Sequence, residues 1–278
     1  MSALSPAGAS RHSLSDVEVQ RANRLDWDRE ADDYQAQHGD FLRDVGFIWS
    51  PEGVDEEKAG LLGEVAGERM LEVGCGAAQC ARWVTTRGAE VLGIDLSYRQ
   101  LQHAQRIDAE TGVSVPVVCA TVDAIPFADR VFGLAFSAFG ALPFVLDITQ
   151  ALREVSRVLR PGGRFVFSVV HPVRRMFADD PTDAGMAVTR SYFDRTPYVE
   201  TDDAGSVSYV EPHHTLGDWV SALRSAGLVL EELVEPPWPT GHSRTWGGWG
   251  PVRGALMPGT AIFVTRRTEQ PTSLQQRG

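Results

Sequence analysis

The fold of this chain is indicated by the stretch Met70-Leu71-Glu72-Val73-Gly74-Cys75-Gly76-Ala77-Ala78 and by the run Val91-Leu92-Gly93-Ile94-Asp95. Each is an apolar segment with an acidic residue at or near its end, and the first continues into a Gly-x-Gly turn. In an α/β sheet, a strand that leads into such a turn, followed about 20 residues later by a strand ending in an acidic residue, holds a nucleoside-bearing cofactor. We therefore expect Asp95 to accept hydrogen bonds from the two ribose hydroxyls.

The glycines of this turn limit which cofactor fits. A Cβ at Gly74 or Gly76 would occupy the space that the ligand needs. A dinucleotide fingerprint, G-x-G-x-x-G, would also need glycine at position 79, where this chain has Gln79. A nicotinamide or flavin dinucleotide, and with it a dehydrogenase, is therefore disfavoured.

Four motifs stand in order along residues 65–170. Glu72, Gly74 and Gly76 match the pattern acidic-x-Gly-x-Gly-x-Gly, with Ala78 in place of the last glycine. The later motifs are Asp95, then Ala124-Ile125-Pro126-Phe127, then Leu159-Arg160-Pro161-Gly162-Gly163-Arg164. This set resembles the class I S-adenosylmethionine-dependent methyltransferases, and within them the small-molecule enzymes of the ubiquinone/menaquinone-biosynthesis type.

The resemblance implies a fold, a cofactor and an activity. The fold is α/β, a Rossmann-like doubly wound seven-stranded sheet whose last strand is antiparallel, with an N-terminal helical lid and insertions on the substrate side. The cofactor is S-adenosyl-L-methionine, and the activity is methyl transfer to an oxygen, nitrogen or carbon atom of a small-molecule acceptor. A regulatory protein that binds the cofactor without transferring a methyl group is the alternative.

The expected cofactor contacts follow from matching these motifs to the chain. Glu72 reaches the cofactor's ammonium group through water, or it caps neighbouring backbone amides. In the family an aspartate bonds the adenine amino group; strict alignment puts Thr121 there, and Asp123 is the other candidate. Tyr34 contacts the methionine end, or it faces the core beside Trp27. The full set of expected contacts is Tyr34, Glu72, Gly74, Cys75, Gly76, Asp95, Leu96, Gln100, Thr121, Val122, Asp123 and Ser137.

Motifs that the sequence lacks reduce the number of methyl-transfer mechanisms that fit this chain. The segment Ser137-Ala138-Phe139-Gly140 has neither the Asn/Asp-Pro-Pro-Tyr signature of enzymes that methylate exocyclic or amide nitrogens nor a Pro-Cys nucleophile. No HExxH or other clustered ligand pattern predicts a metal. His171, His213 and His214 are candidates for a catalytic base, and each could equally make a structural hydrogen bond in a loop.

The spacing of apolar residues, together with residues that cap or end helices, predicts the strands and helices. The expected strands are 70–73, 90–95, 115–120, 131–137, 164–170, 228–234 and 260–265. A helix starts after Asp147 and is ended by Pro161-Gly162-Gly163. Another opens at Thr215 with Asp218 in a capping-box-like position, ends at Gly227, and has an apolar side made of Trp219, Val220 and Leu223.

The chain divides into one core and its additions. We expect an N-terminal tail and helical lid at 1–55, the cofactor-binding core at 56–170, a substrate-side insertion at 171–214, and a C-terminal helix with closing strands at 215–267. The polar tail, 268–278, is expected to be disordered. The insertion and the long loop 235–259, which holds three of the seven tryptophans, should leave the carboxyl edge of the sheet and roof the substrate pocket. The alternative is that their aromatic rings form a satellite core.

Charge and composition limit the partners. The formal net charge of −11 disfavours a phosphate backbone, so we expect a small-molecule acceptor and no nucleic acid. No apolar run approaches the ~18 residues of a transmembrane helix, and the polar N-terminus does not resemble a secretory signal. The three cysteines form no CxxC pair, which favours the cytoplasm. The oligomeric state is not predicted.

Overall fold

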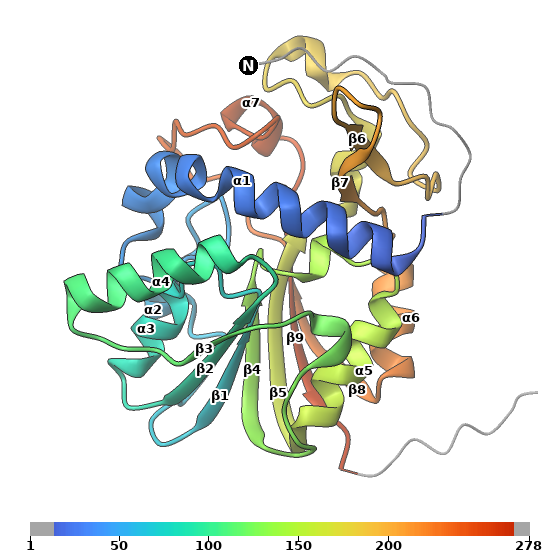
Figure 1. Ribbon diagram of the computed structural model, residues 1–278. Helices are drawn as coiled ribbons and strands as arrows, with labels where there is room; N and C mark the ends of the chain where they lie inside the picture. Colours follow the sequence, from blue (N-terminus) through green and yellow to red (C-terminus); the bar gives the residue numbers. More distant parts are fainter. Residues whose placement is uncertain (1–13, 270–278) are drawn as a thin grey trace, which may run out of the picture.

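The computed structural model describes residues 14–269. Its centre is a seven-stranded sheet with the order β3-β2-β1-β4-β5-β9-β8 (Figure 1). The strands are β1 (Arg69–Val73), β2 (Glu90–Asp95), β3 (Val117–Cys119), β4 (Phe132–Ala138), β5 (Leu159–Val170), β8 (Leu228–Val234) and β9 (Thr260–Arg267). β9 pairs antiparallel with both neighbours, while the pairs among β1 to β5 are parallel. The predicted sheet, with its last strand antiparallel, is confirmed.

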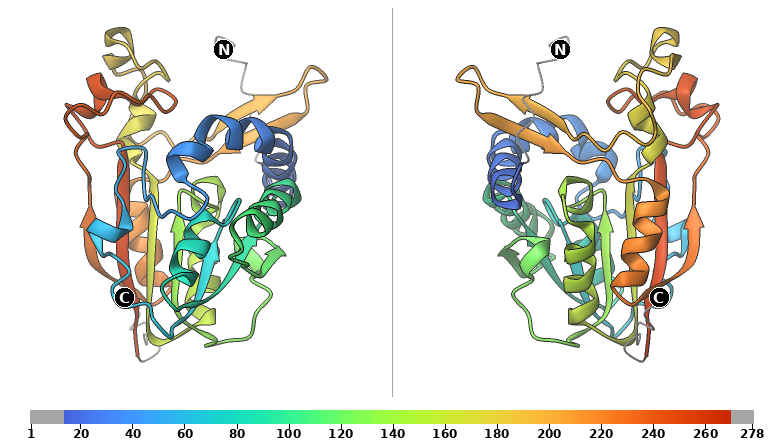
Figure 2. Two further views of the ribbon diagram at one scale, coloured as in Figure 1. Left: turned by 90° about the vertical axis from the view of Figure 1, so that its left-hand side faces the viewer. Right: turned by 90° about the vertical axis from the view of Figure 1, so that its right-hand side faces the viewer.

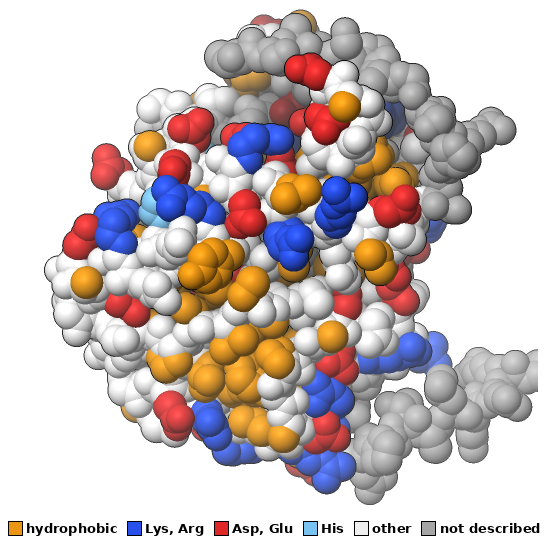
Figure 3. Space-filling model, viewed as in Figure 1, with side chains coloured by type: hydrophobic (Ala, Val, Ile, Leu, Met, Phe, Trp, Pro, Cys, Tyr) orange, Lys and Arg blue, Asp and Glu red, His pale blue; other side chains and the backbone are white. Residues whose placement is uncertain are grey.

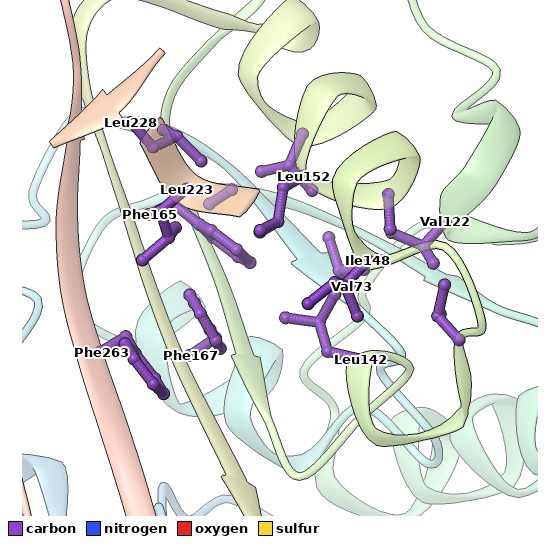
Figure 4. Packing of buried hydrophobic residues seen from close by; sticks show 14 of the residues in the cluster. Val73, Val122, Leu142, Ile148, Leu152, Phe165, Phe167, Leu223, Leu228 and Phe263 are labelled. Atoms are coloured by element: carbon purple, nitrogen blue, oxygen red, sulfur yellow. The ribbon is translucent and has the colours of Figure 1, made fainter. Parts of the chain in front are cut away.

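Helices cover both faces of the sheet. One face packs against α5 (Ile148–Val158) and α6 (Leu216–Ser225), and the other packs against α3 (Gln79–Thr85), α4 (Tyr98–Thr111) and the segment 45–65, which contains α2 (Glu56–Ala59). Figure 4 shows the first of these cores, where Leu152 of α5 and Leu223 of α6 lie over Phe165 of β5. Both faces are buried by apolar side chains, as a parallel sheet requires.

Two details of these helices correct the sequence analysis. Asp147 caps α5 as expected, its carboxylate accepting from the Gln150 amide at 3.0 Å. The helix ends earlier than predicted, however, because Leu159 is already extended and pairs with Phe132; Pro161-Gly162-Gly163 lies inside β5 rather than at the helix end. In α6, Thr215 and Asp218 form the predicted capping box, but Val220 is 45% exposed and does not belong to the buried side.

The long helix α1 (Asp16–Leu42) lies at the carboxyl edge of the sheet (Figures 1 and 2). The remaining elements there are η1 (Val122–Ala124), η2 (Leu142–Phe144), η3 (Pro172–Met176), η4 (Asp183–Met186), the hairpin β6 (Tyr198–Thr201) and β7 (Val207–Glu211), and α7 (Pro251–Gly254). Acidic and basic side chains are interspersed over the outer surface of α1 and α4 (Figure 3). Residues 1–13 and most of the tail expected to be disordered, 270–278, lie outside the described part of the chain.

Candidate active site

The glycine turn after β1 has a left-handed backbone. The φ angles are +69° at Gly74 and +52° at Gly76, a region that side chains disfavour. A Cβ on Gly76 would meet only the Gln100 side chain, at 3.9 Å, and would otherwise point into open space. A Cβ on Gly74 would instead lie 2.1 Å from the Ala141 backbone nitrogen. A side chain at Gly76 would therefore project into open space beside the turn, whereas Gly74 is required by contact with protein backbone.

Asp95, at the end of β2, faces this turn. Its two carboxylate oxygens accept from the backbone amides of Gly76, at 2.7 Å, and Ser97, at 2.8 Å. Burial raises the pKa of Asp95 above its usual value, and these amide bonds oppose the rise. A carboxylate has about four lone-pair positions, so Asp95 still has acceptor capacity for hydroxyl donors.

Glu72, on β1, is almost fully buried. Its carboxylate accepts from the Ala81 amide in the first turn of α3 at 2.9 Å, which is the amide-capping role weighed in the sequence. Burial raises the pKa of Glu72 to about 8. A cationic partner would relieve this cost by favouring the charged carboxylate.

Thr121 and Asp123 lie together at η1, after β3. The Thr121 hydroxyl accepts from the Asp123 amide at 3.4 Å and donates to the Asp123 carboxylate at 3.2 Å. The same carboxylate accepts from Gln20 of α1 at 2.7 Å. Burial raises the pKa of Asp123 above its usual value.

These residues share one cavity at the carboxyl edge of the sheet. It measures about 1370 Å³ including its open mouth, and residues of α1 line one side of it. Eleven of the twelve expected cofactor contacts line it: Tyr34, Glu72, Gly74, Cys75, Gly76, Asp95, Leu96, Gln100, Thr121, Val122 and Asp123. Ser137 does not; it is fully buried, and its hydroxyl lies near Gly140 in the wall behind the cavity.

Helix α1 is attached to this site by polar side chains. Gln79, the residue that replaced the third glycine of a dinucleotide motif, donates to Gln35 at 3.0 Å, and Gln35 donates to Gln100 at 3.0 Å. The Asp28 carboxylate accepts from the Ser97 hydroxyl at 2.7 Å and from the Arg99 amide at 3.0 Å at the start of α4. Gln20, Gln35 and Asp28 were missed in the sequence because isolated polar residues on a long helix carry no motif.

The comparisons with known proteins agree with this geometry. A family model described as a methyltransferase domain matches residues 71–167. The methyltransferase GfsG of Streptomyces halstedii is 31% identical over 227 residues, which cover 74% of this chain and 75% of that protein. A crystal structure of an S-adenosylmethionine-dependent methyltransferase from Mesorhizobium loti has a TM-score of 0.62 and 28% identity, and the match covers 78% of this chain and 100% of that one. The chain belongs to the S-adenosylmethionine-dependent methyltransferases.

Other methyltransferases match a shorter part. A malonyl-[acyl-carrier protein] O-methyltransferase of Pseudescherichia vulneris is 38% identical over 39% of this chain and 41% of that enzyme. A ubiquinone biosynthesis O-methyltransferase of Alkalilimnicola ehrlichii is 35% identical over 42% of this chain and 48% of that enzyme. The match to these two relatives thus spans less than half of their length.

The cavity of this methyltransferase fits the family's cofactor. A nucleoside with an amino-acid end needs a hydroxyl-accepting carboxylate, a glycine where no side chain projects, and an anion for an ammonium group. Asp95 offers a carboxylate, Gly76 has no side chain, and Glu72 offers a carboxyl group, and all three line one cavity. Among residues 14–269, no group of three His, Cys, Asp or Glu side chains could hold a metal ion, and no helix is long and apolar enough to cross a membrane.

The three candidate base histidines of the methyltransferase lie elsewhere. The ring Nε2 of His171 lies 2.7 Å from the Glu235 carboxylate, that of His213 lies 2.8 Å from the Tyr192 carbonyl, and that of His214 lies 2.9 Å from the Val145 carbonyl. All three line a second, smaller cavity of about 330 Å³ and are absent from the lining of the large one. Burial lowers the pKa of each.

The two insertions differ in what they contribute to the large cavity. From the loop 235–259 only Trp246 lines it, and the insertion 171–214 supplies no lining residue. The β6-β7 hairpin of that insertion packs along α1 instead, where Asn23 exchanges hydrogen bonds with the Val210 backbone at 2.8 and 3.0 Å. The insertion thus braces the helix that covers the cavity.

A histidine that the sequence analysis did not single out lies beside Trp246. The ring of His38, on α1, stacks on Trp246 with centroids 3.8 Å apart and an interplanar angle of 17°. Tyr34 and Phe41, on the same helix, also contact Trp246, at centroid distances of 6.2 and 5.9 Å. Burial, and then the charge of Arg244, lower the pKa of His38. The spacing of Tyr34, His38 and Phe41 along one helix was the available signal.

Proposed function

We propose that this chain transfers the methyl group of S-adenosyl-L-methionine to a small-molecule acceptor. The observation that carries the proposal is the convergence of Asp95, Glu72 and Gly76 on one large cavity at the carboxyl ends of the parallel strands, where α/β sheets bind ligands. Relatives with transferase names support a catalytic rather than a purely regulatory role.

The proposed roles follow the geometry. Asp95 accepts from the ribose hydroxyls with the lone pairs that Gly76 and Ser97 leave free. Glu72 faces the ammonium group, through water, while one of its oxygens caps α3. Leu96, Gln100 and Cys75 complete the nucleoside and methionine walls in this proposal, and Tyr34 covers the methionine end from α1.

The adenine ring is proposed to lie at η1, beside Thr121, Val122 and Asp123. Because Gln20 and Thr121 both donate to Asp123, that carboxylate is held in place by two partners. It retains acceptor capacity for an exocyclic amine. Ser137 is proposed to support the Gly140 turn from behind rather than to contact the cofactor.

The cofactor, when bound, supplies a methyl group on a sulfonium, ready for in-line displacement. The chain's residues then hold the acceptor atom close to this carbon, where placement accounts for much of the rate. Residues of helix α1 line the cavity and limit the access of water to it. His171, His213 and His214 remain the predicted bases, but they line the smaller cavity, so each would have to move toward the acceptor to act.

The partners and the compartment are part of the proposal. A net charge of −11 and four acidic residues on the cavity wall, Asp16, Glu72, Asp95 and Asp123, disfavour nucleic acid as the acceptor. Free thiols at Cys75, Cys80 and Cys119 support a reducing cytoplasm.

Titration calorimetry with S-adenosylhomocysteine tests the cofactor site, and its release from S-adenosylmethionine in a metabolite extract tests transfer. We expect the protein to bind this product, and Asp95→Ala to bind it about ten- to a hundred-fold more weakly, since a hydrogen bond to a charged group contributes about 1.5–3 kcal/mol. Asp203→Ala, in an exposed loop, is the matched control and should bind normally. Equal affinity in Asp95→Ala and the wild type would contradict the assignment.

A further inference from the structure

The wall of the large cavity away from the strand ends is aromatic. Helix α1 contributes Trp27, Tyr34 and Phe41, and the loop 235–259 contributes Trp246. Flat apolar walls of this kind favour flat apolar ligands, because ring faces bury large areas and stack with little loss of side-chain freedom.

The same cavity has a one-sided charge. Its acidic residues lie on the cofactor side and at the start of α1, and among the described residues that line it there is no Lys, Arg or His. Arg244 packs over the ring of Phe41, 4.6 Å from the centroid, and does not line the cavity. An anionic group placed against this wall would be desolvated without a cationic side chain to pair with it, which costs several kcal/mol in general.

Trp246 is held in its position by α1. Its ring stacks on His38 and contacts Tyr34 and Phe41, and its backbone bonds with Trp249 at 2.8 and 3.0 Å close the local turn. No hydrogen bond to the His38 ring is found among residues 14–269, and its Nδ1 is buried without a partner. The role of His38 in this arrangement is therefore the stack itself.

We propose that the acceptor is a flat, apolar molecule without an anionic group, that it packs against Trp246, and that His38 positions Trp246 for this contact. This rests on the proposed function for the cofactor side of the cavity. It separates the chain from methyltransferases whose acceptor is a carboxylate or a phosphorylated compound, since such an acceptor would find no cation on this wall.

A matched pair of probes tests the acceptor class. 2-Naphthol and 2-naphthoate share one ring system and differ in that one is neutral and the other anionic at neutral pH. With S-adenosylhomocysteine at saturation, we expect 2-naphthol to quench tryptophan fluorescence saturably and 2-naphthoate to bind at least tenfold more weakly. Equal or tighter binding of the carboxylate, or no binding of 2-naphthol, would overturn the proposed class.

Variants test the wall and its support. Trp246→Ala should weaken 2-naphthol binding at least tenfold, whereas Trp238→Ala, in the same loop but outside the cavity lining, should not change it. His38→Ala should weaken 2-naphthol binding and His38→Phe should restore it, because phenylalanine keeps a ring to stack on Trp246 while a merely polar role would not be rescued. Unchanged 2-naphthol affinity in Trp246→Ala, or failure of rescue by His38→Phe, would overturn the assignment.

Affinity for S-adenosylhomocysteine, measured by calorimetry on the same variants, keeps this inference separate from the proposed function. We expect it to stay within about threefold of the wild type in all four. Loss of that binding in the wild type would contradict the cofactor site. If the wild type binds S-adenosylhomocysteine but prefers 2-naphthoate to 2-naphthol, the proposed acceptor class is contradicted and the cofactor site is not.

Discussion

Gly74→Ala and Gly76→Ala should differ in what they damage, although the two residues lie in one turn. The Gly74→Ala methyl would stand 2.1 Å from the Ala141 nitrogen and 2.7 Å from the Gly140 carbonyl carbon, both of which are backbone atoms that cannot rotate away. The Gly76→Ala methyl meets no atom closer than 3.9 Å and projects into the cavity. The first substitution should therefore damage the fold, and the second should damage binding.

The magnitudes follow from the backbone and the contacts. Both residues have positive φ, and a left-handed alanine costs about 1–2 kcal/mol. Gly74→Ala adds overpacking of about 1–3 kcal/mol, for a total of roughly 2–5 kcal/mol. At about 2–4 °C per kcal/mol, its Tm should fall by ~4 °C or more, against ~2–8 °C for Gly76→Ala.

Calorimetric melting and titration with S-adenosylhomocysteine measure the two effects on the same samples. Gly76→Ala should remain folded and bind at least tenfold more weakly, because its methyl occupies ligand space. Wild-type affinity in a folded Gly76→Ala protein would refute the reasoning, since the turn would then be a packing feature with no ligand above it.

Three further outcomes are expected. The pKa of Glu72 is raised from 4.5 to about 8 in the folded protein. Between these pH values Glu72 is ionised in the unfolded chain and takes up a proton on folding, so stability should fall by up to roughly 4–5 kcal/mol as pH rises through that window. Chemical denaturation of Glu72→Gln should show a flatter pH profile, and an unchanged one would contradict the burial argument. Asp28→Ala removes the bonds from Ser97 and the Arg99 amide, so hydrogen exchange in α1 should become faster and affinity for S-adenosylhomocysteine should drop several-fold; unchanged exchange would mean that other contacts hold the helix. His171→Ala should bind S-adenosylhomocysteine within about twofold of the wild type, because its ring pairs with Glu235 outside the large cavity, and a large loss would place it nearer the cofactor than the structure does.

The core of the fold could be predicted because its signals are local. A strand, a glycine turn and an acidic strand end follow one another within residues 70–95, and backbone sterics at φ > 0 restrict what can stand at Gly76. The capping box of Thr215 with Asp218 is equally local. The residues of these segments that are predicted to contact the cofactor therefore line one cavity.

The covering of the cavity could not be predicted in the same way. The place where a loop leaves the sheet is fixed by topology, but where it goes depends on contacts between distant segments. The insertion 171–214 follows β5 and then packs on α1 through Asn23 and Val210. Helix α1 itself is held by single polar residues such as Gln35, which have no periodic or motif signal.

A crystal structure with S-adenosylhomocysteine tests the central claim most directly. We expect the ribose hydroxyls within hydrogen-bonding distance of the Asp95 carboxylate and the adenine at η1 beside Thr121 and Asp123. The amino-acid end should lie above Gly76 and toward Glu72, under α1. Density for the ligand in another cavity, or a ribose held by residues other than Asp95, would contradict it.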